Sequence, residues 1–487
     1  MPLFQPTFKH SSAFLKLFTG GIFAIITAVV IGFAISKSLS IALVIPGVLA
    51  VLFIAMVCIT NTEAGLYIIM AYSFFISFID RLLFNDAIPE GVPADLLVLI
   101  TFAGMAFHQE KLSALFSDFT KNTIIIIFLI LYIYTAMQLF NPSGNFLTGW
   151  FQAVRKVVST FLILFIAYNV FADRRAIYRF IKYLFVLASI VAVYACIQEV
   201  HGFFNFEINW LSADEKRYRM TFVNGGARRM STFPDALSLS IVMSMCAVFF
   251  TGYLTGVKKM QHKILLGCGV LFMVLAMSFS LTRTANVMLM GGLFVFLLIT
   301  FDKPLSRIVA FTGLFAFLFV LYVPFGHVHM HQFRQTFKGA TKDASYIVRE
   351  VNRKRIQPYI YSHPIGGGLN TTGHEGRKNN PGHPLAGFPP DSGYLKKALE
   401  LGWIGFALLL ILYFTILKTA IRGYFITASP QKKVLYAACA GSFFALYMGD
   451  FAQEAIGQIT DVVVYFPLIA MVLRLRKTES ETLNFAS

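Results

Sequence analysis

Two arginines beside long apolar segments are the residues of this sequence best suited to bind phosphate. Arg229 precedes the segment 231–235, Ser-Thr-Phe-Pro-Asp, and Arg283 lies in a short Leu-Thr-Arg-Thr turn between two apolar segments. Ionisable residues at a membrane surface are functional by default, and a guanidinium offers a planar fork to phosphate oxygens. We expect both arginines to be functional, with Arg228 competing with Arg229 for its role. Snorkelling to lipid headgroups is the structural alternative.

Asp391 is the candidate for acid–base chemistry. It follows two prolines and begins a predicted helix that continues through Ile404. A carboxylate at the membrane surface can take the proton of an attacking hydroxyl group. Aspartate is also among the best N-cap residues of a helix. The sequence leaves both roles open.

The segment 345–361 is predicted to form an amphipathic helix with two arginines on one face. Arg349 and Arg353 are four residues apart, so a helix makes them neighbours. Two guanidinium groups suit a diphosphate, whereas a solvated charged face is the alternative. Pro358 is expected to kink or end this helix.

The polar loop before Asp391 holds further candidates. His374 and His383 are candidate substrate-binding residues and the next candidates for a general base. The turn 363–368, His-Pro-Ile-Gly-Gly-Gly, needs unusual backbone angles. It does not follow a strand, so it is not assigned as a nucleotide-binding motif.

A metal site is a weaker hypothesis. His327, His329 and His331 alternate along one short segment, which makes metal binding conceivable. No cysteine or carboxylate cluster at matching spacing accompanies them. We therefore expect no metal and no other cofactor.

The composition is that of a membrane protein. Of the 487 residues, 57% are hydrophobic and 13% are charged, whereas soluble domains carry about 25% charged residues. Apolar segments near 20 residues long recur along the chain, and each is long enough to cross roughly 30 Å of hydrocarbon. The sequence predicts an all-α polytopic membrane protein with about 14 transmembrane helices, within a range of roughly 12–14, and a large, partly helical extracytoplasmic loop. The predicted helices centre near Thr27, Gly47, Tyr72, Thr101, Leu131, Leu164, Leu187, Met245, Leu271, Gly292, Ala316, Leu408, Phe443 and Tyr465.

Lysines and arginines in alternate short loops predict the orientation. Arg174 and Lys258 stand in such loops, and the C-terminal tail follows Arg474. The bias of basic residues toward the cytoplasm therefore places both termini there. The chain divides into an N-terminal transmembrane bundle (1–200), an outer basic loop (201–235), transmembrane helices (236–325), a large outer loop predicted to be catalytic (326–392), C-terminal transmembrane helices (393–475) and a cytoplasmic tail (476–487).

The formal net charge of +17 reflects this cytoplasmic bias in part. No nucleic-acid-binding module is recognisable, so we expect no nucleic-acid partner. The segments 203–233 and 325–391 and the turn at Arg283 are basic although they lie on the outer side. An anionic ligand would explain this charge, and anionic lipid headgroups are the alternative.

The order of these motifs resembles that of the O-antigen ligase and Wzy-type O-antigen polymerase superfamily of bacterial envelopes. The resemblance covers roughly residues 228–406. It rests on the Ser-Thr-Phe-Pro-Asp segment, the Leu-Thr-Arg-Thr turn, the turn 363–368, the Asp-Ser-Gly-Tyr-Leu segment at 391–395, and Glu-Leu-Gly-Trp-Ile-Gly at 400–405.

The resemblance implies a metal-independent, inverting glycosyltransferase in the bacterial inner membrane, with its catalytic loop in the periplasm. Its donor would be a glycan on undecaprenyl diphosphate, and its acceptor a glycan or a lipid. Membrane lipids and other polysaccharide assembly proteins are further expected partners. The site implied by the resemblance consists of catalytic Asp391, Arg283 and Arg229, with Arg228, Arg349, Arg353, Tyr394, His374 and His383 as substrate-binding residues.

Ligases of this group typically have histidine where this chain has Asp391, which favours a polymerase of O-antigen or exopolysaccharide. A ligase that transfers the glycan to lipid A-core or another acceptor is the first alternative. A transporter or flippase for lipid-linked glycans is the second, but it would need charged groups near mid-membrane and repeat symmetry. A non-catalytic envelope assembly protein is a third possibility.

Overall fold

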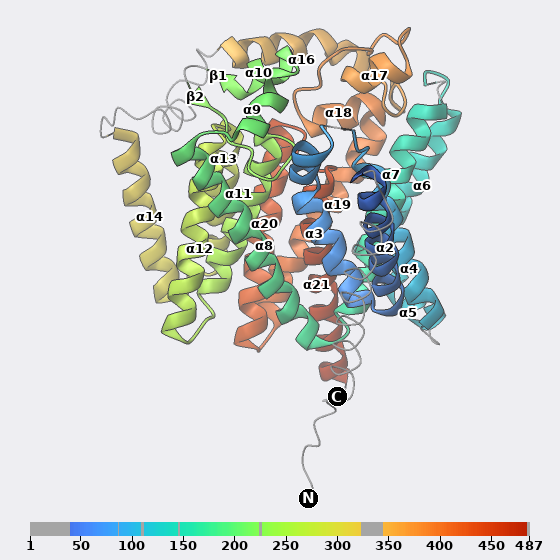
Figure 1. The fold of residues 1–487 in the computed structure, drawn as a ribbon. Helices are drawn as coiled ribbons and strands as arrows, with labels where there is room; N and C mark the ends of the chain where they lie inside the picture. The colour runs from blue at the N-terminus through green and yellow to red at the C-terminus, as the bar shows by residue number, and fades with distance from the viewer. Residues whose placement is uncertain are drawn as a thin grey trace, which may run out of the picture.

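The computed structural model describes residues 39–85, 87–108, 112–144, 147–223, 226–322 and 344–484. These residues form a bundle of α-helices with one very small sheet (Figure 1). In that sheet β1 (Phe222–Val223) pairs antiparallel with β2 (Gly226–Ala227). The prediction of an all-α polytopic membrane protein is confirmed.

The long helices of the bundle make up its membrane-embedded body. They are α2 (Leu39–Thr60), α3 (Thr62–Leu83), α4 (Gly91–His108), α6 (Thr123–Met137), α7 (Leu147–Val170), α8 (Arg174–His201), α11 (Ala236–Leu254), α12 (Met260–Phe279), α13 (Arg283–Ile299), α14 (Pro304–Tyr322), α19 (Gly402–Ile426), α20 (Pro430–Ala452) and α21 (Ile459–Asn484). Shorter elements connect or cover them: α5 (Leu112–Thr120), η1 (Gln138–Phe140), α9 (Asn205–Ser212), α10 (Glu215–Thr221), α16 (Ala344–Ser362), α17 (Gly373–Asn379) and α18 (Gly393–Glu400).

Helices occupy the predicted transmembrane positions. Within the described residues, nine helices are long and apolar enough to cross a membrane. Each predicted centre from Gly47 to Tyr465 falls on a helix, and Thr27 lies outside the described residues. The total of about 14 spans stays a prediction.

Small residues let the central helices approach closely. A Cβ atom built on Gly441 of α20 would lie 2.9 Å from the carbonyl oxygen of Gly292 on α13, and one on Gly292 would lie 2.8 Å from the oxygen of Gly441. A Cβ on Gly252 of α11 would meet Ala438 of α20 at 2.9 Å. Between helices in lipid, such close van der Waals contact is a main source of association. The α11–α13–α20 core therefore depends on the absence of side chains at these positions.

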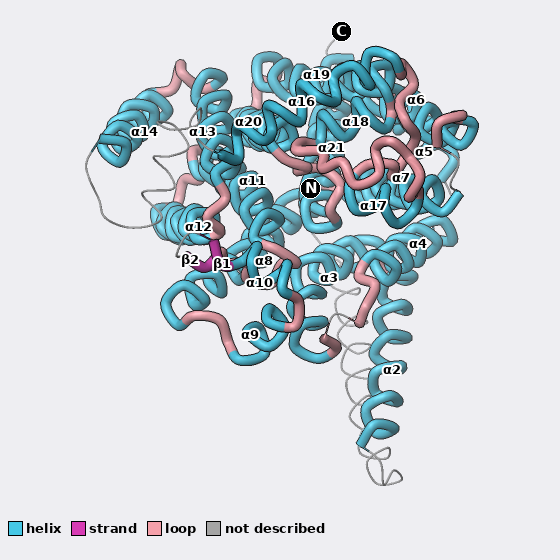
Figure 2. The backbone as a smooth tube through the Cα atoms, turned by 90° about the horizontal axis from the view of Figure 1, so that it is seen from above, coloured by secondary structure: helices cyan, strands magenta, loops and turns pink. Residues whose placement is uncertain are grey.

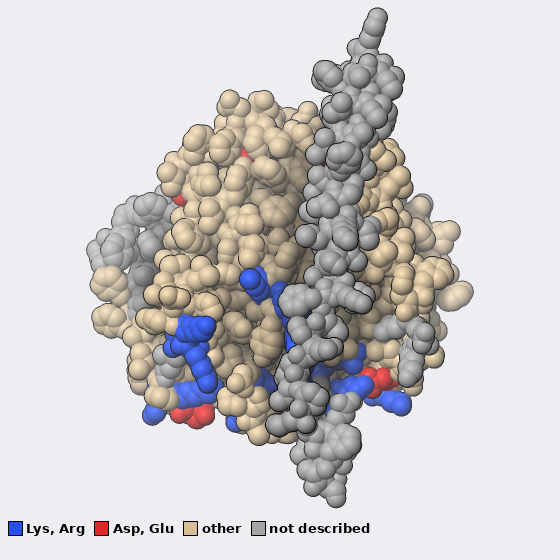
Figure 3. Space-filling view, turned by 60° about the horizontal axis from the view of Figure 1, so that its bottom comes forward, with Lys and Arg blue, Asp and Glu red and all other residues tan. Residues whose placement is uncertain are grey.

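The two ends of the bundle differ. The short helices α9, α10, α16, α17 and α18 gather at the upper end in Figure 1, and the C-terminal end of α21 lies at the opposite end. Figure 3 brings this lower end forward and shows Lys and Arg side chains there with few acidic ones, while the upper part of the view is almost free of charge. The starts of α8 and α12, which follow the basic loops, lie at that end. The predicted alternation of basic loops is thus visible in the structure.

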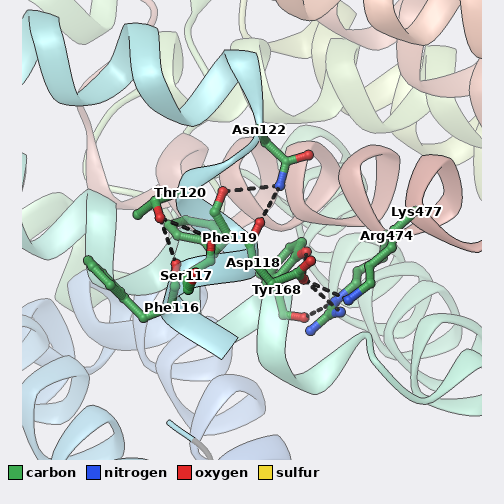
Figure 4. A network of polar contacts seen from close by, with 9 residues as sticks. All are labelled: Phe116, Ser117, Asp118, Phe119, Thr120, Asn122, Tyr168, Arg474 and Lys477. Atoms are coloured by element: carbon green, nitrogen blue, oxygen red, sulfur yellow. Dashed lines mark hydrogen bonds and ion pairs between the residues drawn. The ribbon is translucent and has the colours of Figure 1, made fainter. Parts of the chain in front are cut away.

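A polar network fixes α21 to the bundle at the basic end (Figure 4). Lys477 donates to Asp118 Oδ2 at 2.8 Å, and Tyr168 donates to the same oxygen at 2.7 Å. Arg474 donates to the carbonyl oxygen of Tyr168 at 2.6 Å, and its guanidinium lies over the Tyr168 ring. Partial burial alone would raise the pKa of Asp118, but the hydrogen bonds from Lys477 and Tyr168 lower it below its ordinary value. These contacts therefore hold the C-terminal part of α21 against α5 and α7.

We predict that Gly441→Leu destabilises the folded protein, because its side chain has no room against the backbone of α13. The expected loss is roughly 1–3 kcal/mol, as for overpacked cores. It is measured by denaturant unfolding of the purified protein in detergent. Gly267→Leu on α12 is the matched control, because a Cβ there meets no atom within 4 Å. Equal stability of the two variants would contradict the packing argument.

Candidate active site

The glycine-rich turn 363–368 docks on the junction between α18 and α19. Gly366 has φ +81° and Gly402 has φ +71°. A Cβ on Gly366 would clash with the backbone nitrogen of Gly402, and one on Gly402 would clash with the carbonyl oxygen of Pro364. Only glycine adopts these angles at this separation without strain. The predicted unusual backbone angles are confirmed.

The backbone amides of this turn hold the loop in place. Gly367 N donates to Leu399 O at 2.8 Å, and Gly368 N donates to Glu400 O at 3.1 Å. From the other side, Asn141 donates through Nδ2 to the carbonyl oxygen of Gly366 at 3.0 Å. These glycine amides are therefore used to position the loop rather than to bind a phosphate.

The three residues of the segment 391–393 have different structural roles. Ser392, not Asp391, is the N-cap of α18, since its side chain accepts a hydrogen bond from Leu395 N at 3.1 Å. Gly393 leaves room for Asp450, whose Oδ1 a Cβ there would strike. Asp391 is left without a capping role. The expectation of one helix from Asp391 through Ile404 is wrong, because the chain breaks at Leu401 and Gly402.

Asp391 lines a cavity at the upper end, which has a volume of about 770 Å³. Its Oδ2 atom is shielded from solvent and accepts no hydrogen bond from the described residues. The cavity is lined by α3, α10, the start of α11, α16 and the turn after α20. Its charged lining residues are Arg81, Glu90, Asp214, Lys216, Arg217, Arg228, Asp235, Arg349, Asp391 and Glu454.

Arg228 reaches this cavity from the loop before α11. Its Nε donates to Ser280 O at 3.1 Å, and its Nη2 donates to Thr282 Oγ1 at 3.0 Å, so the tip between α12 and α13 holds it. Burial lowers the pKa of Arg228, while the nearby carboxylate of Asp235 opposes the shift. An arginine remains charged at such a site. Arg228 forms no salt bridge with a described carboxylate, so its charge is available to a ligand.

Arg349 reaches the cavity from α16, which lies across the upper end over α18 and α20 (Figure 2). It donates to Ala452 O at 3.4 Å, and Arg353 lies over the Phe451 ring at 5.6 Å. The prediction that these arginines share one helical face is confirmed. Pro358 was expected to kink or end this helix; it does not end it, since α16 runs to Ser362, and a kink there stays a prediction.

Two further arginines of the cavity were not predicted as site residues. Arg81 on α3 is 2% exposed and donates to Ser77 O at 3.0 Å and to Ser231 O at 2.8 Å. Arg217 on α10 lies over the Trp210 ring at 3.8 Å, and Arg81 lies 5.3 Å from the same ring. An arginine within an otherwise apolar helix such as α3 is the sequence signal that would have revealed Arg81.

The five acidic side chains of the cavity do not simply cancel its five basic ones. Asp214 caps α10 by accepting from Arg217 N at 3.0 Å, and Asp235 caps α11 by accepting from Ser238 N at 2.8 Å. Glu454 binds Lys396, outside this cavity, at 2.7 Å. Three of the acids thus have backbone or ionic partners, whereas Asp391 keeps an oxygen free.

The structure does not bring the other predicted residues into this cavity. Arg229 turns to Glu199, 2.8 Å away, and packs over the Phe203 ring. Arg283 is at the start of α13 and is absent from the lining, although its neighbour Thr282 holds Arg228. Of these three arginines, only Arg228 lines the cavity together with Asp391.

The remaining predicted residues, Tyr394, His374 and His383, do not line this cavity. Tyr394 packs against Phe406, Tyr413 and Phe451. His374 is exposed on α17.

His383 accepts a hydrogen bond from Leu385 N at 3.1 Å and lies edge-on to Tyr359. Burial and the nearby charge of His363 lower its pKa. In the described part of the chain, no group of three or more His, Cys, Asp or Glu residues is placed to hold a metal ion. The alternating histidines at 327, 329 and 331 lie outside the described residues.

A protein family model matches a region of the chain that contains part of this cavity. Residues 268–410 match a family model described as O-antigen ligase. The matched region runs from α12 through α13, α16, α17 and α18 into α19. Among curated protein sequences, none is significantly similar to this chain.

The matched region supplies only part of the cavity. Arg349 and Asp391 lie within it, whereas Arg81, Arg228 and Glu454 come from flanking segments. The match supports a ligase- or polymerase-type role in O-antigen assembly. It also implies lipid-linked glycan and acceptor substrates in general terms.

Proposed function

We propose that this protein is a metal-independent, inverting glycosyltransferase that polymerises undecaprenyl-diphosphate-linked repeat units at the periplasmic face of the inner membrane. The observation that carries this proposal is the cavity at one end of the bundle, which is lined by Arg228, Arg349 and Asp391 and in which Asp391 keeps a free carboxylate oxygen. A lipid-linked donor would enter the cavity from the membrane.

The arginines would bind the diphosphate of the donor. Arg228 and Arg349 carry no salt bridge within the described residues, so a diphosphate would meet unneutralised charge. Preorganised positive charge stabilises a leaving group that gains negative charge in the transition state. The arginines therefore fill the role that a metal ion plays in other glycosyl transfers.

Asp391 would act as the general base. The acceptor hydroxyl oxygen attacks the anomeric carbon, the bond from that carbon to the diphosphate oxygen breaks, and Asp391 Oδ takes the hydroxyl proton. Undecaprenyl diphosphate leaves with both electrons of the broken bond. Attack from the face opposite the leaving group inverts the anomeric centre. The free Oδ2 suits this step, because no hydrogen bond must be given up to accept the proton.

A ligase is the second candidate, because the family model that matches is described as O-antigen ligase. The aspartate at position 391 favours the polymerase. Deletion of the gene followed by a gel of surface glycans separates the two. We expect loss of long chains with single repeats remaining. Long chains that accumulate on undecaprenyl diphosphate would instead show a ligase, and unchanged surface glycans would contradict both.

We predict that Arg228→Ala lowers turnover at least tenfold, since a charge-assisted hydrogen bond to phosphate contributes roughly 1.5–3 kcal/mol. Arg229→Ala, next to it in sequence, should keep most of its turnover because Arg229 pairs with Glu199. Turnover of lipid-linked repeat units in liposomes is the measurement. Arg228→Lys should restore activity only in part, because lysine lacks the planar fork. The reverse order of the two alanine variants would refute this assignment of the cavity.

We predict that Asp391→Asn folds normally and loses about a hundredfold or more in turnover, the usual scale for a general base. Because Ser392 is the N-cap of α18 and Asp391 is not, the substitution at Asp391 does not remove a helix cap. Donor binding should be retained, because the arginines make that contact. Ser392→Ala is the control for a capping defect, and it should lower stability by about 1 kcal/mol. Normal turnover of Asp391→Asn would assign the base elsewhere.

A further inference from the structure

A second cavity opens on the other side of α18, with a volume of about 170 Å³. It lies between α6, α7, α19 and α21, below the loop at Leu369 and Asn370. Its charged lining residues come from the upper end, whereas its deeper lining is mostly apolar and includes several Tyr and Thr side chains. The apolar residues include Phe128, Leu131, Leu409, Leu412 and Phe466.

Three lysines stand at the polar end of this cavity: Lys156 on α7 and Lys396 and Lys397 on α18. Lys396 is paired with Glu454 at 2.7 Å. Burial alone would lower the pKa of Lys396, but the charges of Glu400 and Glu454 raise it to about 12. Lys156 and Lys397 make no hydrogen bond or salt bridge in the described part of the chain.

The position of Lys156 makes its lack of a partner informative. It lies within α7, which is apolar and long enough to span a membrane. A charged residue in such a helix normally pairs or marks a ligand pathway. Lysines outnumber acids in the cavity lining, three against Glu400 and Glu454, while Glu375 acts on Lys156 and Lys396 from outside the lining. A cationic end above an apolar cavity matches a lipid with an anionic headgroup.

The two cavities share one wall. Glu454 lines both, and α18 runs between them with Asp391 at the first and Lys396 and Lys397 at the second. We propose that the second cavity binds the acceptor, a second lipid-linked glycan whose diphosphate lies at Lys156 and Lys397 and whose first isoprenoid units lie on the apolar lining. This inference rests on the proposed function, with the donor in the first cavity.

Paired substrate analogues in liposomes of phosphatidylcholine test this assignment. The donor analogue has its acceptor hydroxyl replaced by hydrogen, so it cannot accept. The acceptor analogue has a carbon–phosphorus bond at the anomeric carbon, so it cannot be transferred. We expect the double variant Lys156→Gln, Lys397→Gln to raise KM for the acceptor about tenfold or more. KM for the donor should stay within twofold. Lys418→Gln, at an exposed position on α19, is the matched control.

Unchanged acceptor KM, or equal changes in both KM values, would overturn the assignment. If the acceptor KM of the double variant differs from wild type only when phosphatidylglycerol is present, the lysines bind ordinary anionic phospholipid and the proposal also fails.

A binding measurement separates this inference from the proposed function, because it does not need turnover. The purified wild type in nanodiscs should bind two molecules of the acceptor analogue, one in each cavity, and the double variant one. If wild type shows no turnover but binds two molecules, the polymerase proposal fails while the second lipid site stands. One molecule bound by both proteins would overturn the second site.

Discussion

The close approach of Gly366 to Gly402 is the constraint on which the upper end of the molecule depends. Two backbones meet where neither tolerates a Cβ atom, and two amide hydrogen bonds from the glycine turn secure the contact. This contact separates α18 from α19, so α18 turns out of the membrane body and presents the segment 391–393 to the cavity. A polar loop of this length would otherwise lack a fixed position relative to the helices.

Arg228 is held in the cavity by neutral partners. Carbonyl oxygens and hydroxyl groups orient Arg228, and the Trp210 ring supports Arg217. Neutral hydrogen-bond acceptors fix a guanidinium without neutralising it. The contrast with Arg229, which is paired with Glu199, shows how two adjacent arginines can differ in their capacity to bind an anion.

The sequence predicted the helices, the shared face of Arg349 and Arg353, and the unusual angles of the glycine turn, because these follow from local periodicity and residue type. The sequence did not show which of Arg228 and Arg229 lines the cavity, because the direction in which each side chain of a loop points depends on the three-dimensional structure. It also missed Arg81 and Glu454, which reach the cavity from distant parts of the chain.

The position of α18 has a geometric consequence for the sugars themselves. Lys397 lies four residues after Gly393, the first residue of α18, and a helix rises about 1.5 Å per residue, so roughly 6 Å of helix separate Lys397 from the segment that carries Asp391. A phosphate held at one end must therefore carry enough sugar rings to reach the other. The length of this rigid helix would therefore set a minimum length for the glycan of the acceptor, and an acceptor with a shorter glycan would not reach Asp391.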